Sequence, residues 1–201
     1  HYAHDLSPYN GNIPQIKYED IALDPKVYDG DRYRPQYHAI PPGHWMNEPH
    51  APIYYKGKYH LFYQHNPQGP FFHQIHWGHW VSDDLVHWEY MPVALSPQKG
   101  DIAPDGMWAG SATYDANGKP VLLFTAGNDS KAPNQAVGLA TPKDINDPYL
   151  KEWEVYPRLI NEQKPGMGKF GEFRDNFTWK DGEKWYQIVT SGSTITKSGT
   201  A

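Results

Sequence analysis

The stretch GKYHLFY (residues 57–63) sets the architecture, because two later stretches of the chain repeat its pattern. They read GKPVLLF (118–124) and GEKWYQIV (182–189); each follows a short strand-like segment, turns at a glycine and returns as a strand. The three glycines lie 61 and 64 residues apart. A second marker, WEYMP (88–92), returns as WEVYP (153–157) at an offset of 65 residues. The chain is therefore predicted to contain repeated β-units of one length.

Each unit consists of a hairpin, a third strand (75–82 and 135–140) and a fourth strand around the Trp-Glu pair. This is the pattern of a four-stranded propeller blade, so the predicted fold class is an all-β propeller. A parallel α/β sheet is disfavoured because no window keeps helical periodicity for three turns. A β-sandwich is the remaining alternative, but it does not require markers at one period.

The number of units is the next constraint. A chain of 201 residues holds little more than three units, whereas closed propellers have at least about four blades. We therefore expect residues 45–201 to form part of a propeller, about three blades, and the chain to end inside a repeat. Residues 1–44 are polar and rich in proline, and they are expected to be a lead-in with room for one edge strand. Within them, YNGN (9–12) and YDGD (28–31) are expected to form turns.

Composition excludes several classes of function. The net charge is −5 and the 18 basic residues are scattered singly, so a nucleic-acid partner is not expected. No run is apolar enough to cross a bilayer, so no membrane partner is expected either. The absence of cysteine excludes thiol catalysis and disulfides. The N-terminus shows no signal pattern, which leaves two alternatives: a cytoplasmic protein, or an extracellular or cell-surface protein whose leader is absent.

Two acids fall at related positions of different units. Glu48 precedes its hairpin glycine by nine residues, Asp175 precedes its own by seven, and Ser111 occupies the matching place in the middle unit. The first strand of a propeller blade lines the central channel, so these side chains are expected to meet at one mouth. Two carboxylates with the neighbouring Arg174 are the groups that glycoside chemistry needs. We also expect Pro49, with Pro52, to make the Glu48 segment a rigid strand entrance rather than mid-sheet backbone.

Other polar groups have simpler interpretations. Asp83–Asp84 is typical of a turn that caps a strand. His73, His76 and His79 alternate faces on a strand, so they are expected to pack and hydrogen bond rather than share a metal ion. Glu172 is a weak candidate for an acid.

Several motifs, in order, resemble glycoside hydrolase family 32, the invertase, inulinase and levanase group that acts on β-fructosides. They are WMNEPH (45–50), LFYQHNP (61–67), IHWGHWVSDDLVHW (75–88), WAGSA (108–112) and FRD (173–175).

The resemblance implies a five-bladed propeller followed by a β-sandwich, against which this part would pack. It also implies a retaining hydrolase of fructose-containing oligo- or polysaccharides that needs no metal or organic cofactor. Glu48 would be the nucleophile, Asp175 the transition-state stabiliser, and Arg174 the group that orients it. The residues that would bind substrate are Asn47, Gln64, Trp77, Trp108, Ser111 and Arg174.

The chain departs from the family in two ways. The family usually has Asp at the position of Glu48, and Asn-Gly at the position of His50-Ala51. The family's acid/base is a Glu in a later blade, and no such motif follows Asn176; Glu183 on a hairpin turn is a poor candidate. We therefore expect this segment alone to be almost inactive. A fructosyltransferase, including a cyclising one, and a non-catalytic fructan-binding propeller stay open as alternatives.

Overall fold

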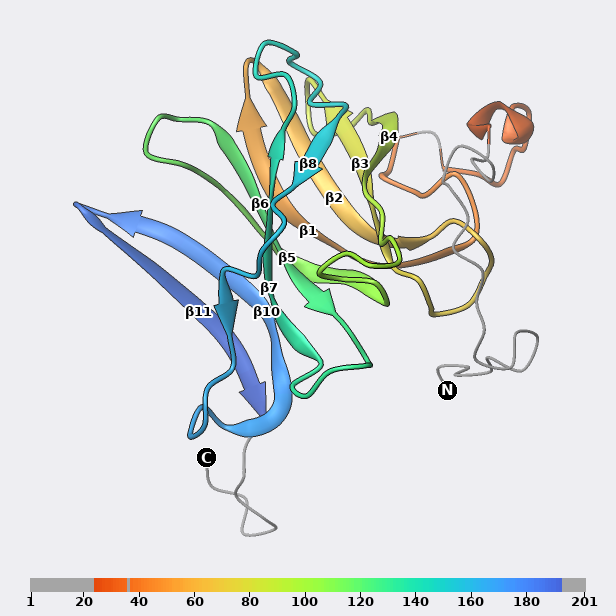
Figure 1. The fold of residues 1–201 in the computed structure, drawn as a ribbon. Helices are drawn as coiled ribbons and strands as arrows, with labels where there is room; N and C mark the ends of the chain where they lie inside the picture. The colour runs from red at the N-terminus through yellow and green to blue at the C-terminus, as the bar shows by residue number, and fades with distance from the viewer. Residues whose placement is uncertain (1–23, 36, 193–201) are drawn as a thin grey trace, which may run out of the picture.

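The computed structural model describes residues 24–35 and 37–192, which form three antiparallel sheets that follow one another across the molecule (Figure 1). The first blade contains β1 (Trp45–Tyr55), β2 (Lys58–Asn66), β3 (His76–Ser82) and β4 (Glu89–Leu95) in that spatial order. The second contains β5 (Gly106–Tyr114), β6 (Pro120–Gly127), β7 (Gln135–Pro142) and β8 (Trp153–Val155), and the short β9 (Asn161–Glu162) also pairs with β7. The third sheet is the hairpin of β10 (Lys169–Asp181) and β11 (Lys184–Gly192).

The repeat predicted from the sequence is confirmed by these sheets. Gly57, Gly118 and Gly182 occupy the hairpin turns with φ of 84°, 77° and 57°, a region that glycine enters without steric cost. The third and fourth strands form where the unit pattern placed them. The described chain therefore comprises two four-stranded blades and a further hairpin, with the all-β architecture of a propeller.

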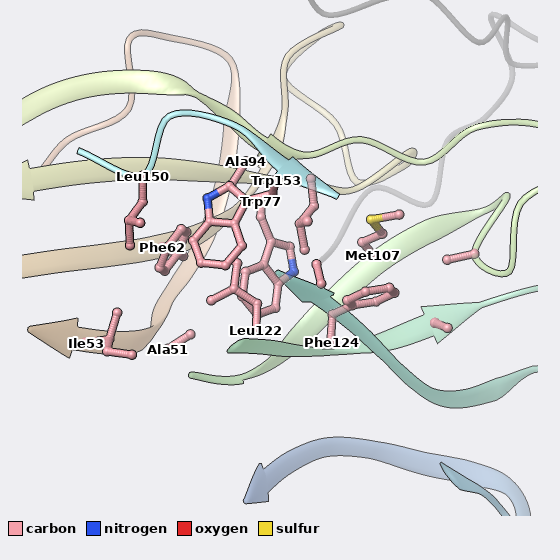
Figure 2. Close-up of a cluster of buried hydrophobic side chains, with 14 residues drawn as sticks. Ala51, Ile53, Phe62, Trp77, Ala94, Met107, Leu122, Phe124, Leu150 and Trp153 are labelled. Atoms are coloured by element: carbon pink, nitrogen blue, oxygen red, sulfur yellow. The ribbon is translucent and has the colours of Figure 1, made fainter. Parts of the chain in front are cut away.

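Buried side chains fill the space between successive sheets. Successive side chains of β6 point to opposite faces of the sheet, so alternate residues belong to two different hydrophobic clusters. Leu122 and Phe124 join the cluster shared with the first blade, which includes Phe62 and Trp77 (Figure 2). The side chains of the cluster on the other face, toward the hairpin, are Val121, Leu123, Val137 and Phe173. Burial on both faces of the middle blade fixes the order of the sheets.

A glycine on the third strand of each blade makes room for an aromatic ring. Gly78 pairs with Tyr63, and Gly138 pairs with Phe124. A Cβ atom at Gly78 would lie 2.1 Å from the Tyr63 ring, and one at Gly138 would lie 2.3 Å from the Phe124 ring. Any larger residue at either position would therefore push the ring out of the core.

The lead-in is described from residue 24 onward, except for residue 36. Its regular element within residues 24–35 and 37–44 is the 3-10 helix η2 (Pro25–Tyr28), capped by Asp24, whose carboxylate accepts a hydrogen bond of 2.9 Å from the Lys26 N–H. The turn predicted at residues 28–31 is confirmed, whereas the turn predicted at residues 9–12 lies outside the described residues. The described lead-in shows no strand, and the rest of the edge-strand prediction falls on residues outside the description. No helix among the described residues is long and apolar enough to cross a membrane.

Candidate active site

The innermost strand of the first blade carries Glu48 in a β-bulge. Between Met46 and Pro49, β1 advances three residues while β2 advances two, from His65 to Tyr63. A regular strand would turn Asn47 and Glu48 to opposite faces, but the extra residue lets both side chains line one cavity.

The prediction that Pro49 lies at a strand entrance is wrong, because Pro49 and Pro52 both lie within β1. The sheet tolerates them because β1 is an edge strand and its pairing is interrupted at two places. The prolines still stiffen the backbone that presents Glu48.

Gln64 holds the Glu48 carboxylate. This side chain comes from β2 and is only 6% exposed, and its Nε2 donates a hydrogen bond of 2.5 Å to Glu48 Oε1. A buried amide is a rigid donor, so it fixes the orientation of the carboxylate. Within the described part of the chain, the other oxygen, Oε2, has no hydrogen bond of its own.

The second carboxylate lies in a similar bulge on β10. Between Arg174 and Phe177 the strand advances three residues against two on β11, and Asp175 has φ of 54°. Arg174 and Asp175 consequently both line the cavity although they are neighbours in sequence. Arg174 Nε lies 3.6 Å from Asp175 Oδ2.

Thr125 fixes the backbone at this bulge. Its fully buried hydroxyl accepts a hydrogen bond of 3.0 Å from the Asp175 N–H and donates one of 2.8 Å to the carbonyl oxygen of Ala109. Ala109 is the extra residue in the bulge of β5, between Trp108 and Gly110. One hydroxyl therefore links the bulges of two inner strands.

The charges in the cavity affect one another. Partial burial raises the pKa of Asp175, the Arg174 guanidinium opposes this shift, and the nearby Glu48 carboxylate raises the pKa further. Glu48 acts on the Asp175 pKa because the two acids, 127 residues apart in the chain, line the same cavity. Arg174 also forms an ion pair with Glu172, and this pair holds the pKa of Glu172 below its usual value. Glu172 is consequently an ionised partner of Arg174 and not a proton donor.

The cavity has a volume of about 630 Å³ and gathers residues from all three sheets. Six of the residues that line it were named from the sequence: Asn47, Glu48, Gln64, Trp108, Arg174 and Asp175. The other three residues of the lining, Phe72, Asp129 and Gln135, were not named from the sequence. Phe72 and Asp129 lie on loops between strands, where no repeat pattern marks them. Gln135 begins β7, and its Oε1 accepts hydrogen bonds from the Phe173 N–H (3.1 Å) and Arg174 Nη1 (3.3 Å).

Two predicted binding residues do not reach this cavity. Trp77 is fully buried in the core between the first two blades, where its indole N–H donates a hydrogen bond of 3.1 Å to the Trp108 carbonyl oxygen. Ser111 is 4% exposed, and its hydroxyl has no hydrogen-bond partner. The bulge of β5 falls at Ala109, two residues before Ser111, so an equal distance from the hairpin glycine does not give Ser111 the orientation of Asp175.

The residues after Glu48 adapt to the changed motif. Ala51 is buried and has φ of 52°, a conformation in which a Cβ atom is unfavourable. The His50 ring packs against Trp77 with centroids 4.2 Å apart, and burial lowers its pKa to about 4. His50 is therefore a neutral group that packs against the core between the first two blades.

Asp84, His76 and His79 have the structural roles expected of them, whereas His73 lies before β3 and not on a strand. Asp84 accepts hydrogen bonds from the N–H groups of Val86 and His87, and so caps the turn before β4. His76 and His79 are buried, and His79 stacks on Phe62. No group of three or more His, Asp or Glu side chains in residues 24–35 and 37–192 has a geometry that could hold a metal ion.

The comparison with known families agrees with this geometry. The family model for the N-terminal domain of glycosyl hydrolases family 32 matches residues 38–201. This chain belongs to glycosyl hydrolase family 32. The resemblance inferred from the sequence motifs is thus confirmed.

Three relatives show how far the similarity extends. A fructan 6-exohydrolase of Beta vulgaris is 47% identical over 177 residues, 81% of this chain and 28% of the relative. The insoluble β-fructofuranosidase isoenzyme CWINV1 of Arabidopsis thaliana is 43% identical over 175 residues, 84% of this chain and 29% of the relative. The crystal structure of fructan 1-exohydrolase IIa from Cichorium intybus superposes with a TM-score of 0.73 at 36% identity, and covers 81% of this chain and 30% of that chain. The chain therefore spans less than a third of the length of these relatives.

Proposed function

We propose that the whole protein is a retaining β-fructosidase and that this chain supplies its nucleophile and its transition-state stabiliser. One observation carries the proposal: Glu48, Asp175 and Arg174 line one cavity with Asn47, Gln64 and Trp108. The relatives named above are fructan exohydrolases and a β-fructofuranosidase. A fructose-terminated oligo- or polysaccharide is the proposed substrate.

The first chemical step follows from the Glu48 geometry. Gln64 occupies Oε1, so Oε2 attacks the anomeric carbon of the terminal fructose. A new carbon–oxygen bond to Glu48 forms while the bond to the leaving-group oxygen breaks, and that oxygen takes a proton from a general acid. The family resemblance assigns this acid to a Glu of a later blade, and we propose no residue of this chain for the role. The chain alone is accordingly expected to be nearly inactive.

The second step releases the sugar. Water attacks the anomeric carbon of the fructosyl-enzyme, the same acid acts now as a base, and Glu48 leaves as a carboxylate. Asp175 accepts hydrogen bonds from ring hydroxyls and stabilises the positive charge that develops on the sugar. Arg174, held by Glu172 and Gln135, keeps the Asp175 carboxylate in place.

The departure at Glu48 favours one further candidate, a fructan-binding propeller without catalysis. A Glu side chain reaches one methylene further than the Asp usual in the family, and catalytic geometry tolerates little misplacement. The contact between Gln64 and Glu48 supports the catalytic proposal, because it places the longer side chain under the same kind of control that catalysis requires.

The test uses the full-length protein with sucrose, 1-kestose, inulin and levan. We expect fructose to be released, and mass spectrometry of rapidly quenched enzyme to find a fructosyl group on the peptide that contains Glu48. New oligosaccharides or cyclic dianhydrides would identify a fructosyltransferase instead. Binding without turnover would identify the binding propeller. An extracellular or cell-surface location belongs to the same proposal, and fractionation of the source cells tests it.

A further inference from the structure

A second cavity lies where the lead-in meets the outer strand of the first blade. It has a volume of about 280 Å³. Figure 1 shows the lead-in on the side of this blade that faces away from the β10–β11 hairpin. The cavity shares no residue with the one around Glu48. The residues that line it are Tyr28, Asp29, Gly30, Arg34, Pro35, His38, Ile40, Trp88 and Tyr90.

Arg34 holds the walls of this cavity together. Its guanidinium lies 4.5 Å from the centroid of the Tyr28 ring, a cation–π distance. Its Nη2 donates hydrogen bonds to the Pro41 carbonyl oxygen (2.6 Å) and to the Tyr90 hydroxyl (3.1 Å). One side chain thus ties the turn after η2, the end of the lead-in and β4 to one another. A cavity fixed in this way is pre-organised, so a ligand would lose little affinity in ordering it.

Three polar groups of the lining are left over for a ligand. Within the described residues, the Asp29 carboxylate, the His38 imidazole and the Trp88 indole N–H make no hydrogen bond. The same cavity presents the aromatic rings of Tyr28, Trp88 and Tyr90. The lining therefore combines flat apolar faces with an unused acceptor and unused donors.

The charges favour a neutral ligand. Arg34 is the cation of the lining at neutral pH, and its Nη2 is committed to the wall. The carboxylate of Asp29 would repel an anion. A sugar ring suits this set of groups: its C–H faces pack on aromatic rings, its hydroxyls donate to a carboxylate and accept from an indole or imidazole N–H. A volume of about 280 Å³ is at the lower end for a ligand cavity, which limits the occupant to a single ring.

We propose that this cavity is a second carbohydrate-binding site, which holds one ring of a neutral saccharide at the outer rim of the first blade. Asp29 accepts hydrogen bonds from the sugar hydroxyls and Trp88 supports the ring face. The site lies beside β4, whereas Glu48 lies on β1, at the opposite edge of the same sheet. It would therefore hold a saccharide without occupying the catalytic cavity, and it does not depend on the proposed chemistry of Glu48.

The test labels the full-length protein, carrying Glu48→Gln to prevent turnover, with 5-fluorotryptophan and follows its fluorine NMR signals during titration with 1-kestose. Trp88→Phe and Trp108→Phe identify the two reporter signals. We expect the Trp88 signal to shift in a saturable way. Asp29→Ala should raise the dissociation constant measured from the Trp88 signal by at least about tenfold, because a hydrogen bond to a charged group is lost. Asp101→Ala, an exposed acid outside both cavities, should leave it unchanged.

Three results would overturn the proposal: a Trp88 signal that does not move up to the solubility limit of 1-kestose, an Asp29→Ala variant that binds as well as the parent, or a shift produced by sodium sulfate and not by the sugar. The last would identify an anion site. The Trp108 signal reports separately on the cavity around Glu48, so failure at one site is distinguished from failure at the other.

Discussion

The first and second blades share one topology but have very different interiors. All the histidines of the chain precede β4 or lie in the turn just before it, and the first blade buries His60, His65, His76 and His79. The second blade contains no histidine, and its central strand β6 buries mainly aliphatic side chains. The bulge of β1 presents a carboxylate, whereas the bulge of β5 presents Ala109 and offers its carbonyl oxygen to Thr125. The comparison teaches that one scaffold can present an acid at the bulge of one inner strand and only a backbone carbonyl at the bulge of the next.

The largest expected effect is the loss of kcat when the acid on the inner strand of the first blade is replaced. Glu48→Gln in the full-length enzyme should lower kcat by at least about 1,000-fold, since an amide cannot form the covalent intermediate. Ser111→Ala, on the inner strand of the second blade but two residues beyond its bulge, should change kcat by less than about twofold because it removes only a buried hydroxyl without a partner. Steady-state kinetics with sucrose and 1-kestose measure both. Equal effects of the two substitutions would contradict the division of roles between the blades.

Acid should destabilise the first blade before the second. Burial lowers the pKa values of His60, His65 and His76 to about 4, well below the unfolded value near 6.5. The folded state therefore binds fewer protons, so this stability is complete above about pH 6.5 and is lost as the pH falls toward 4. Hydrogen exchange at pH 7 and pH 5 should show lost protection in β2 and β3 and much less change in β6 and β7.

Two variants sharpen this prediction. His65→Gln should flatten the pH dependence of the free energy of unfolding, because one buried titrating group is removed. Gln98→Ala changes an exposed side chain in the loop after β4 that does not titrate, and it should leave the slope as it is. Equal loss of protection in both blades would show that the buried histidines do not control the acid response.

A smaller effect is expected at the link between blades. Thr125→Val removes the hydroxyl that holds the Asp175 N–H and should lower kcat by about tenfold, the value of one buried hydrogen bond, with little change in KM. Thr125→Ser keeps the hydroxyl and should restore most of the rate. A uniform loss of stability in both variants with normal kcat would show that Thr125 is only structural.

The smallest effect is expected on the free energy of unfolding, when alanines near the bulges of β1 and β5 are replaced by glycine. Ala51→Gly relieves an unfavourable φ of 52° but loses a buried methyl group, so the free energy of unfolding should change by less than about 1 kcal/mol. Ala109 has no positive φ, and Ala109→Gly should destabilise by about 1 kcal/mol or more. Urea unfolding of both variants measures the difference. A larger cost at Ala51 would mean that its conformation carries no strain.

The sequence predicted the blades well because their signals are local. Hairpin glycines and the Trp-Glu markers sit at fixed distances within each unit, and the turns at Gly57, Gly118 and Gly182 need nothing from the rest of the chain. The prediction that Glu48 and Asp175 face one cavity also held, since the repeat places both at the start of an inner strand.

The sequence failed where a bulge or a distant contact decides orientation. Counting from the hairpin glycine treated Ser111 and Asp175 alike, but the extra residue falls at a different point of each strand. Trp77 was named from a motif, yet packing between the blades buries its ring. Phe72 and Asp129 come from loops, and Thr125 acts through a residue 50 positions away. Such contacts exist only in the folded chain.

The Trp108 side of the cavity around Glu48 depends on two glycines that have no side chain. Trp108 lies against Gly106 and Gly127, where a Cβ atom would stand 2.4 Å and 2.7 Å from its indole. A single methyl group at either glycine would force the indole to move and so change the shape of the cavity. Gly106 and Gly127 do not line the cavity themselves, so substitutions at these positions could change which substrates fit without changing a residue of the lining.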